Sequence, residues 1–297
     1  MISANVFDIK RFGVNDGNGI RTVLFIKGCP LRCKWCHNPE GISPEIHLWH
    51  VPSRCVNCGS CIAACPQGAL SSDEQGIRID DEKCDLCGEC IRACPTGAMQ
   101  ADAVRMTVDE AMEQIERDRV FYGDSGGVTL SGGECTASPE FSLEVLRQCR
   151  ERGINTAIET SMFAPTEVMR AFAESTDSII ADLKLIDPER HKAATGTDNA
   201  LILQNFEWLA HSGKDLVIRI PLIPGYTADE ENLDGIAAYI ANINPDVPVE
   251  LINFNPMCVG KYESLRRDFI TAPGSPYPPE RMKEFKRIVA KHGLTVK

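Results

Sequence analysis

Short apolar runs alternate with longer segments of helical periodicity along most of the chain. The runs predict strands because each is brief and ends in turn or polar residues; they are Thr22–Ile26, Gly127–Leu130, Ile154–Ile158, Ser178–Ala181, Leu216–Ile220 and Val249–Phe254. Helical patterns lie at Thr107 through Ile115 toward Tyr122, Pro139–Arg152, Pro165–Ser175, Ala200–Ser212, Asp229–Ile243 and Pro279–His292. Strands joined by helices favour a parallel sheet with right-handed crossovers. We therefore predict an α/β fold, a partial (β/α)6 barrel.

Polar segments follow the predicted strands at the points where the strands end. They are Ser131-Gly132-Gly133-Glu134, Glu159-Thr160-Ser161, Asp182-Leu183-Lys184, Arg219 with Pro221, and Asn253-Phe254-Asn255. In βα barrels the chemistry lies where strands run into the following loops, so these segments predict one shared pocket. Each segment alone is a weak signal, because a Gly-Gly turn or a solvated strand end has the same composition. The same holds for the glycine turn from Asp16 to Arg21 before the first strand.

Three cysteines follow the first strand in one short loop, spaced Cys29-x3-Cys33-x2-Cys36. A [4Fe–4S] cube normally takes four thiolates, so a loop with three leaves one iron open to a substrate or cofactor. Two alternatives stay open on this spacing alone: structural cysteines with a bystander, and a zinc site completed by His37. Zinc sites usually bring a second ligand pair, so we favour the cluster.

Eight more cysteines form an internal repeat between about Ser53 and Met99. Cys55-x2-Cys58-x2-Cys61-x3-Cys65-Pro66 recurs after 29 residues as Cys84-x2-Cys87-x2-Cys90-x3-Cys94-Pro95. Each run resembles that of two-cluster ferredoxins, in which the fourth cysteine ligates the other cluster. We expect one cluster on Cys55, Cys58, Cys61 and Cys94, and one on Cys84, Cys87, Cys90 and Cys65. This predicts a ferredoxin-like insert at 51–100, with repeats at about 46–75 and 76–104, in a core domain of residues 1–50 and 101–297.

Charge and composition limit the partners and the cell compartment expected for the 297-residue chain. Lys plus Arg number 31 and Asp plus Glu 42, and this net charge of −11 disfavours nucleic acid and anionic membrane surfaces as partners. No apolar stretch approaches the roughly 20 residues of a membrane span, and the N-terminus lacks the pattern of a signal peptide. Fourteen cysteines in an unexported chain indicate metal or redox ligands before disulfides. We expect a cytoplasmic iron–sulfur protein that works without oxygen.

Several motifs together resemble one enzyme family. The cysteine loop, with Trp35 before its last cysteine, is similar to the signature of radical S-adenosylmethionine (SAM) enzymes. The further segments are Gly17-x-Gly19-Ile20-Arg21-Thr22, Phe25-x-Lys27-Gly28 leading into the loop, His37-Asn38-Pro39-Glu40 following it, and Ser131-Gly132-Gly133-Glu134. With them the chain resembles the glycyl-radical-enzyme activating enzymes over essentially its whole length. The ferredoxin-like insert resembles the larger subgroup of that family.

The resemblance implies a reaction and its cofactors. SAM would chelate the open iron of the cluster on Cys29, Cys33 and Cys36, and its reductive cleavage would give a 5′-deoxyadenosyl radical. That radical would take a hydrogen from a backbone glycine in the C-terminal glycine loop of a partner glycyl radical enzyme. The implied cofactors are SAM and three [4Fe–4S] clusters, with reduced flavodoxin or ferredoxin as electron donor. The chain is expected to act as a monomer.

The resemblance also implies roles for individual residues. Asp16 would face the incoming glycine loop and belong to the catalytic site with the three loop cysteines. The residues implied in cofactor binding are Trp35, Cys36, His37, Gly132, Gly133, Glu159, Asp182, Leu183, Lys184, Arg219 and Asn255. The chain departs from the family pattern at Asn18 in place of proline, Cys135 in place of a non-thiol residue, and Asn255 in place of histidine.

Other functions and residues stay open at this point. A radical SAM enzyme for a small molecule or peptide is disfavoured by the Gly-Ile-Arg-Thr and His-Asn-Pro-Glu segments. An electron-transfer iron–sulfur protein is disfavoured by the separate three-cysteine loop. Three cysteines lie outside the predicted ligands: we expect Cys149 in the core, and we favour packing over an accessory thiol pair for Cys135 and Cys258.

Overall fold

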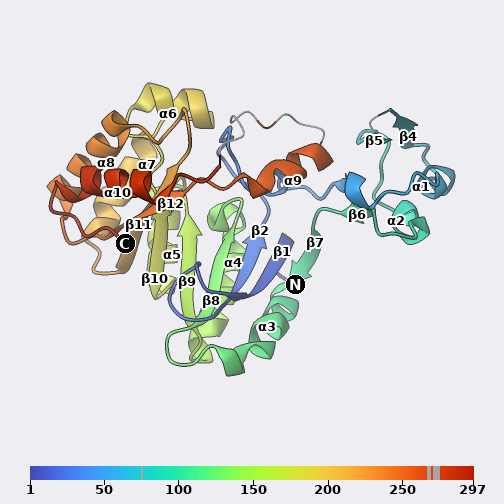
Figure 1. Cartoon of the computed structure of the whole chain (residues 1–297). Helices are drawn as coiled ribbons and strands as arrows, with labels where there is room; N and C mark the ends of the chain where they lie inside the picture. The colour runs from blue at the N-terminus through green and yellow to red at the C-terminus, as the bar shows by residue number, and fades with distance from the viewer. Residues whose placement is uncertain (75, 266–268, 270–274) are drawn as a thin grey trace.

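A computed structural model of the chain describes residues 1–74, 76–265, 269 and 275–297. Its main sheet has eight strands in the order β12-β11-β10-β9-β8-β2-β1-β7 (Figure 1). Their bounds are β1 (Ser3–Gly13), β2 (Arg21–Ile26), β7 (Val104–Thr107), β8 (Gly127–Gly132), β9 (Asn155–Thr160), β10 (Ser178–Asp182), β11 (Asp215–Leu222) and β12 (Val249–Asn253). Neighbouring strands from β12 to β2 are parallel, which confirms the predicted parallel sheet.

Helices connect the parallel strands and pack in chain order, α3 against α4, α4 against α5 and α5 against α7. Their bounds are α3 (Val108–Arg117), α4 (Pro139–Glu151), α5 (Thr166–Ser175), α6 (Pro188–Thr195), α7 (Ala200–Ala210), α8 (Glu230–Ile243), α9 (Val259–Ser264) and α10 (Pro279–Ala290). Short 3-10 turns are η1 (Pro39–Gly41), η3 (Arg119–Phe121), η4 (Cys135–Ala137) and η5 (Pro256–Cys258). The predicted helices are confirmed, and a capping box of Thr107 and Glu110 begins α3. Within the residues described, no helix is long and apolar enough to cross a membrane.

The apolar pattern misses β1, β7, α6 and α9. β1 runs antiparallel to both β2 and β7 and extends the sheet beyond its parallel part. No residue of β1 from Asp8 to Phe12 is buried, so this half of the strand has no apolar run to reveal it. α6 and α9 are short and largely polar, and both turn out to support the site.

The main core lies between the sheet and its helices and contains two of the three cysteines outside the predicted ligands. Cys149 of α4 is fully buried there, with its Sγ 3.9 Å from the Met112 Sδ, which confirms the predicted core position. Cys135 belongs to the same core, and Cys258 is buried elsewhere. Their burial agrees with packing roles for both.

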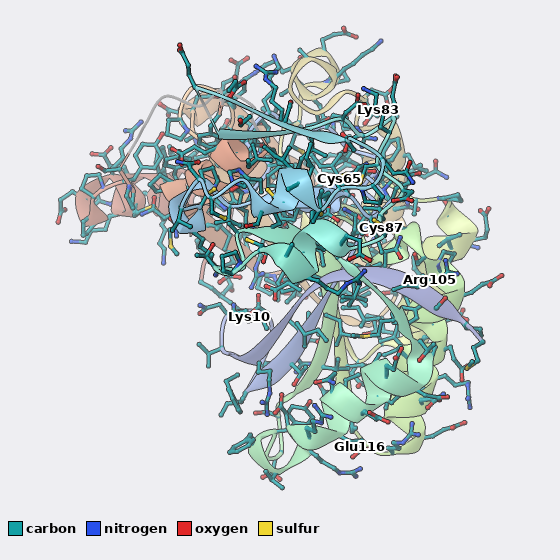
Figure 2. The ribbon with its side chains drawn as sticks, turned by 90° about the vertical axis from the view of Figure 1, so that its right-hand side faces the viewer. Lys10, Cys65, Lys83, Cys87, Arg105 and Glu116 are labelled. Carbon is teal, nitrogen blue, oxygen red and sulfur yellow. The ribbon has the colours of Figure 1, made fainter. Side chains whose placement is uncertain are left out.

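Residues 48–101 form a separate unit at the right of Figure 1. Its parts are η2 (Pro52–Arg54), helices α1 (Ser60–Ala63) and α2 (Glu89–Ala93), and two antiparallel strand pairs, β3 (Leu48–His50) with β6 (Met99–Ala101) and β4 (Leu70–Asp73) with β5 (Gly76–Ile79). Figure 2 shows this insert, with Cys65, Cys87 and Lys83, above Lys10 and Glu116 of the main domain. Positive φ angles recur at the sequence period, at Asn57 and Leu86, Gly59 and Gly88, and Gly68 and Gly97. The sequence repeat is therefore also a repeat of backbone conformation.

A buried ion pair joins the base of the insert to the main domain. The Lys27 Nζ, one residue after β2, lies 2.6 Å from the Asp102 Oδ2, one residue after β6. The Asp102 Oδ1 accepts the backbone N–H of His47 at 2.9 Å, and the Lys27 Nζ donates to the Glu40 carbonyl at 2.7 Å. Because both charged side chains are almost fully buried, removing one leaves the other uncompensated. The pair fixes both ends of the insert beside the cysteine loop.

Lys27→Met is expected to lower the free energy of unfolding by about 3–5 kcal/mol, because it leaves the Asp102 carboxylate buried without its cation. Adding Asp102→Asn should recover part of that loss, since the two side chains are coupled. Denaturant unfolding of both variants measures the effect. Lys83→Met, which removes an exposed partner of Asp80, is the control and should change stability little. A Lys27→Met protein as stable as the wild type would contradict the assignment.

Candidate functional site

A cavity of about 590 Å³ lies at the carboxyl ends of the parallel strands. The structure brings most of the predicted site residues into its lining: Asp16, Cys29, Cys33, Trp35, Cys36, His37, Gly132, Gly133, Glu159, Asp182, Lys184 and Arg219. Two of the residues implied in cofactor binding are outside it. Leu183 packs into the main core, and Asn255 is exposed, with its Oδ1 accepting the Met257 N–H at 3.0 Å.

Alternation along the strands explains why these side chains meet. Successive residues of a strand point to opposite faces of the sheet. The cavity takes alternate residues of β10 and β11, Ile180 and Asp182 on the first, Arg219 and Pro221 on the second. The residues between them lie in the main core: Ile179, Ala181, Ile218 and Ile220. Leu183 follows the same alternation, which is why its side chain points into the core.

The Gly132–Gly133 turn passes directly against the backbone of the cysteine loop. A Cβ on Gly133 would lie 2.2 Å from the Gly41 carbonyl oxygen and 2.5 Å from that of Gly28. A Cβ on Gly132 would lie 2.2 Å from the Ile26 carbonyl oxygen, and the φ of Gly132 is +127°. Only two successive glycines allow this approach, which explains the motif in terms of packing.

Two helices that the apolar pattern misses hold the cysteine loop from outside. The backbone N–H of Arg32 donates to the carbonyl of Thr195 at the end of α6, at 2.7 Å. The hydroxyl of Tyr262 in α9 donates to the carbonyl of Cys36 at 3.0 Å. The loop is therefore fixed by segments more than a hundred residues later in the chain.

The three thiols of the loop are partly exposed and have the protein packed around them. Burial raises the pKa of Cys29 to about 12, and the negative charge of Glu134 adds to this effect. Burial likewise raises the pKa of Cys33 and Cys36. Such thiols are protonated near neutral pH, so binding a metal would release their protons.

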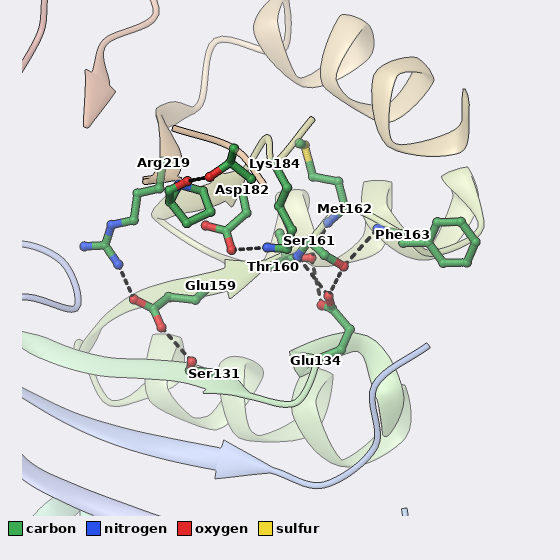
Figure 3. Close-up of polar contacts among 12 residues, drawn as sticks. Ser131, Glu134, Glu159, Thr160, Ser161, Met162, Phe163, Asp182, Lys184 and Arg219 are labelled. Carbon is green, nitrogen blue, oxygen red and sulfur yellow. Dashed lines mark hydrogen bonds and ion pairs between the residues drawn. The ribbon is translucent and has the colours of Figure 1, made fainter. Parts of the chain in front are cut away.

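An ion-pair network centred on Arg219 lies at one side of the cavity (Figure 3). The Arg219 Nη1 donates to Glu159 at 2.6 Å, its Nε donates to Glu250 at 2.7 Å, and its Nη2 donates to the Asn15 carbonyl. The Ser131 hydroxyl donates to the second oxygen of Glu159 at 2.6 Å. Burial raises the pKa of Glu159, and Arg219 opposes that rise. Arg219 thereby ties three strands to the loop before β2.

Glu134 forms a second network, shown at the right of Figure 3. Its carboxylate accepts the Thr160 hydroxyl at 2.7 Å, and the N–H and hydroxyl of Ser161 at 2.9 and 2.6 Å. These donors satisfy a carboxylate that is almost fully buried. The segments that follow the predicted strands contain Glu134, Ser131 and Ser161, but the sequence assigned none of the three an individual role. Their position at or directly after the ends of β8 and β9 was the feature of the sequence that indicated a place in the pocket.

Lys184 carries a positive charge on the wall of the cavity, beside the cysteine loop. Its Nζ donates to the Asp182 carboxylate. Burial opposes its charge, but the Asp182 carboxylate and the Cys33 sulfur outweigh burial and raise the pKa of Lys184. The cation is therefore available to an anionic group in the cavity.

Two further cavities lie in the insert, and each is lined by four cysteines. One set is Cys55, Cys58, Cys61 and Cys94. The second cavity has a volume of about 210 Å³, and its four cysteines are Cys65, Cys84, Cys87 and Cys90. In the part of the chain that the structure describes, no group of three or more His, Cys, Asp or Glu is arranged to hold a single metal ion.

Comparison with known proteins places the chain among established families. The model of the radical SAM superfamily matches residues 23–234. The (2S)-3-sulfopropanediol sulfolyase activating enzyme of Bilophila wadsworthia is 44% identical over 270 residues, 89% of each chain. The choline trimethylamine-lyase activating enzyme of Oleidesulfovibrio alaskensis is 39% identical over 269 residues, 88% of this chain and 87% of its own. The chain belongs to the glycyl-radical-enzyme activating enzymes of the radical SAM superfamily.

The fold of this activating enzyme is also found in more distant proteins. A spore photoproduct lyase variant that is 12% identical aligns over 97% of this chain and 79% of its own, with a TM-score of 0.50. Radical SAM enzymes use SAM and a [4Fe–4S] cluster, and the cavity fits both. Among the described residues, its lining holds three cysteines and no fourth, together with a lysine that can meet a carboxylate.

Gly133→Ala in this activating enzyme is expected to displace the cysteine loop, because the new methyl group would overlap the Gly41 and Gly28 carbonyl oxygens. We expect the loss of most of the iron bound by that loop after anaerobic reconstitution. Iron analysis and electron paramagnetic resonance (EPR) of the reduced protein would measure it. Gly260→Ala is the control, because a Cβ there meets no atom within 4 Å. Wild-type iron and spectra in Gly133→Ala would contradict this role of the turn.

Proposed function

We propose that the cavity at the strand ends is where this activating enzyme binds its cluster and SAM and receives the glycine of its partner. The observation that supports this most strongly is that Cys29, Cys33 and Cys36 line one cavity with charged residues from four strands. The bound cluster and SAM supply an electron and the 5′-deoxyadenosyl radical that takes a hydrogen from the glycine. The chain binds and orients these groups and excludes water.

The two ends of the cofactor's amino acid part match two features of the lining. Lys184 offers positive charge to a carboxylate, with Asp182 holding the Nζ in position. The backbone of the Gly132–Gly133 turn offers carbonyl oxygens to an amine, and the Gly132 carbonyl also accepts the Asn38 Nδ2 at 3.4 Å. Glu159 and Arg219 then form a fixed polar side of the same pocket.

Aromatic rings close the side of the cavity that the cysteine loop provides. Trp35 packs against Tyr226 with ring centroids 5.3 Å apart, and His37 lies 6.5 Å from the Phe254 centroid. Burial, with the positive charge of Lys261, lowers the pKa of His37, so the ring is neutral near pH 7. We propose that Trp35 and His37 lie against the cofactor and keep water from the reacting carbon.

The loop before β2 presents Asp16 to the cavity, and several bonds hold it there. The Thr129 hydroxyl donates to the Asp16 carbonyl at 2.6 Å, and the Lys10 Nζ donates to its carboxylate at 2.9 Å. The buried Arg21 donates to the Asn18 carbonyl at 3.0 Å; burial lowers the pKa of Arg21 to about 10, so it stays charged. We propose that Asp16 contacts the incoming glycine segment.

The insert is proposed as a ferredoxin-like domain, at 51–100, with two [4Fe–4S] clusters. Each cysteine-lined cavity combines three cysteines of one run with the fourth of the other, as in two-cluster ferredoxins. The backbone N–H of Ala69 donates to the Cys65 Sγ at 3.3 Å, and that of Ala98 donates to the Cys94 Sγ at 3.2 Å. Such bonds to sulfur tune the potential of a cluster. With the loop cluster, the enzyme would hold three.

The partner is proposed to be a glycyl radical enzyme with a C-terminal glycine loop. The relatives activate enzymes named sulfolyase, choline trimethylamine-lyase and trans-4-hydroxy-L-proline dehydratase, which makes a lyase or dehydratase the expected class. Reduced flavodoxin or ferredoxin would supply the electron. We expect a monomeric enzyme of the cytoplasm.

Anaerobic incubation with dithionite and SAM is expected to release 5′-deoxyadenosine. With a panel of purified glycyl radical enzymes, comprising those three classes, we expect the EPR doublet of a glycine radical in at least one member. Cys36→Ala, which removes one proposed ligand of the loop cluster, should give neither product. Deoxyadenosine without a radical in any panel member would contradict the proposed protein substrate.

Reconstituted wild-type protein is expected to bind about 12 iron atoms, four for each of three clusters. The triple variant Cys55→Ala, Cys58→Ala and Cys61→Ala should bind about 8 and keep deoxyadenosine formation with dithionite, because the loop cluster is intact. The matched variant with Cys29, Cys33 and Cys36 replaced should also bind about 8 but form none. Equal iron contents in all three proteins would contradict three separate clusters.

A further inference from the structure

Two exposed phenylalanines lie beside the loop that carries Asp16. Phe12, near the end of β1, and Phe121, in η3, meet edge to face with centroids 5.0 Å apart. The two residues remain 47% and 48% exposed, and Val120 next to them is 83% exposed. Val14, two residues after Phe12, is also exposed. Exposed apolar side chains gathered in this way mark a surface for another protein.

Backbone strain and an ion pair between the half-exposed Arg11 and the buried Asp118 hold this surface in one arrangement. Phe12 has a φ of 60°, a left-handed conformation that is unfavourable for a bulky residue. The Arg11 Nε donates to both carboxylate oxygens of Asp118, at 2.9 and 3.0 Å, and Asp118 directly precedes η3. The Arg11 guanidinium also lies 5.0 Å from the centre of the Phe12 ring. The exposed rings are therefore preorganised, which favours binding because little freedom is lost on contact.

We propose that Phe12, Val14, Val120 and Phe121, here called the aromatic rim, form the docking surface for the partner glycyl radical enzyme. The rim lies at the amino ends of β2 and β8 and adjoins the site along the chain, because Val14 directly precedes Asn15 and Asp16, which line the cavity. A cavity of about 590 Å³ can take the cofactor and a short segment, but no folded domain. The body of a protein substrate must therefore rest on the surface beside it. The inference depends on the proposed function, since it requires a protein substrate.

The position of the rim separates it from the surface expected for an electron donor. Lys10 and Glu116, which are close in sequence to the rim, lie below the insert in Figure 2. In the insert, Cys58 and Cys87 are the exposed cysteines, so a donor to those clusters would approach there. The rim thus fits the partner that delivers the glycine.

Val120→Asp and Phe12→Gly test the rim in two ways. The first adds a charge to a highly exposed position, and the second removes a ring while suiting the positive φ. With the panel member that the wild type activates, we expect the partner KM for glycine radical formation to rise about tenfold in both variants. The kcat at saturating partner and the deoxyadenosine formed without partner should not change. Val104→Asp is the control, because Val104 is 57% exposed on β7, outside the rim.

Three other outcomes would each contradict the proposed docking surface, and they can be told apart. An unchanged partner KM in both variants would refute the rim while leaving the proposed function intact. A wild-type enzyme that forms deoxyadenosine but no glycine radical in any panel member would refute the proposed function, and the rim with it. A wild-type dimer that Val120→Asp converts to a monomer, with the partner KM unchanged, would assign the rim to self-association.

Discussion

The contact between the Gly132–Gly133 turn and the backbone of the cysteine loop is the constraint on which the site depends. β2 and β8 are parallel neighbours with Ile26 opposite Gly132, so the loop and the turn leave the sheet at the same level. Without side chains in the turn, the two backbones meet at contact distance. A Cβ at either glycine would separate the cysteines from the polar residues that follow the other strands. The pocket therefore depends on direct contact between the backbone of the turn and the backbone of the cysteine loop.

Charged groups around the pocket are held by specific partners rather than by solvent. Glu134 is satisfied by hydroxyl and backbone donors, Glu159 by Arg219 and Ser131, and Lys184 by Asp182. Buried charges are tolerated only when they are paired in this way. The result is a polar pocket of fixed geometry, and such preorganisation is what an enzyme needs when a bound cofactor carries out the difficult chemical step.

The insert faces the cysteine loop because both its ends are fixed beside it. The Lys27–Asp102 pair joins the residue after β2 to the residue after β6. A further cavity of about 710 Å³ between the two units is lined by Cys33 of the loop and by Trp49 and Ile77 of the insert. This arrangement brings the cysteine-rich insert close to the loop, which is the geometry that an electron relay would require.

The sequence by itself determined the parallel strands, the helices between them and the cysteine spacings, since these follow from local periodicity and from ligand chemistry. It also indicated most of the residues that meet in the pocket. Only the tertiary structure decided which side of each strand end faces the pocket. It placed Leu183 in the core and Asn255 at the surface, and it showed which partners Glu134, Ser131 and Ser161 have in the pocket. It also revealed β1, α6 and α9, which the apolar pattern does not mark and whose positions depend on contacts between residues far apart in the chain.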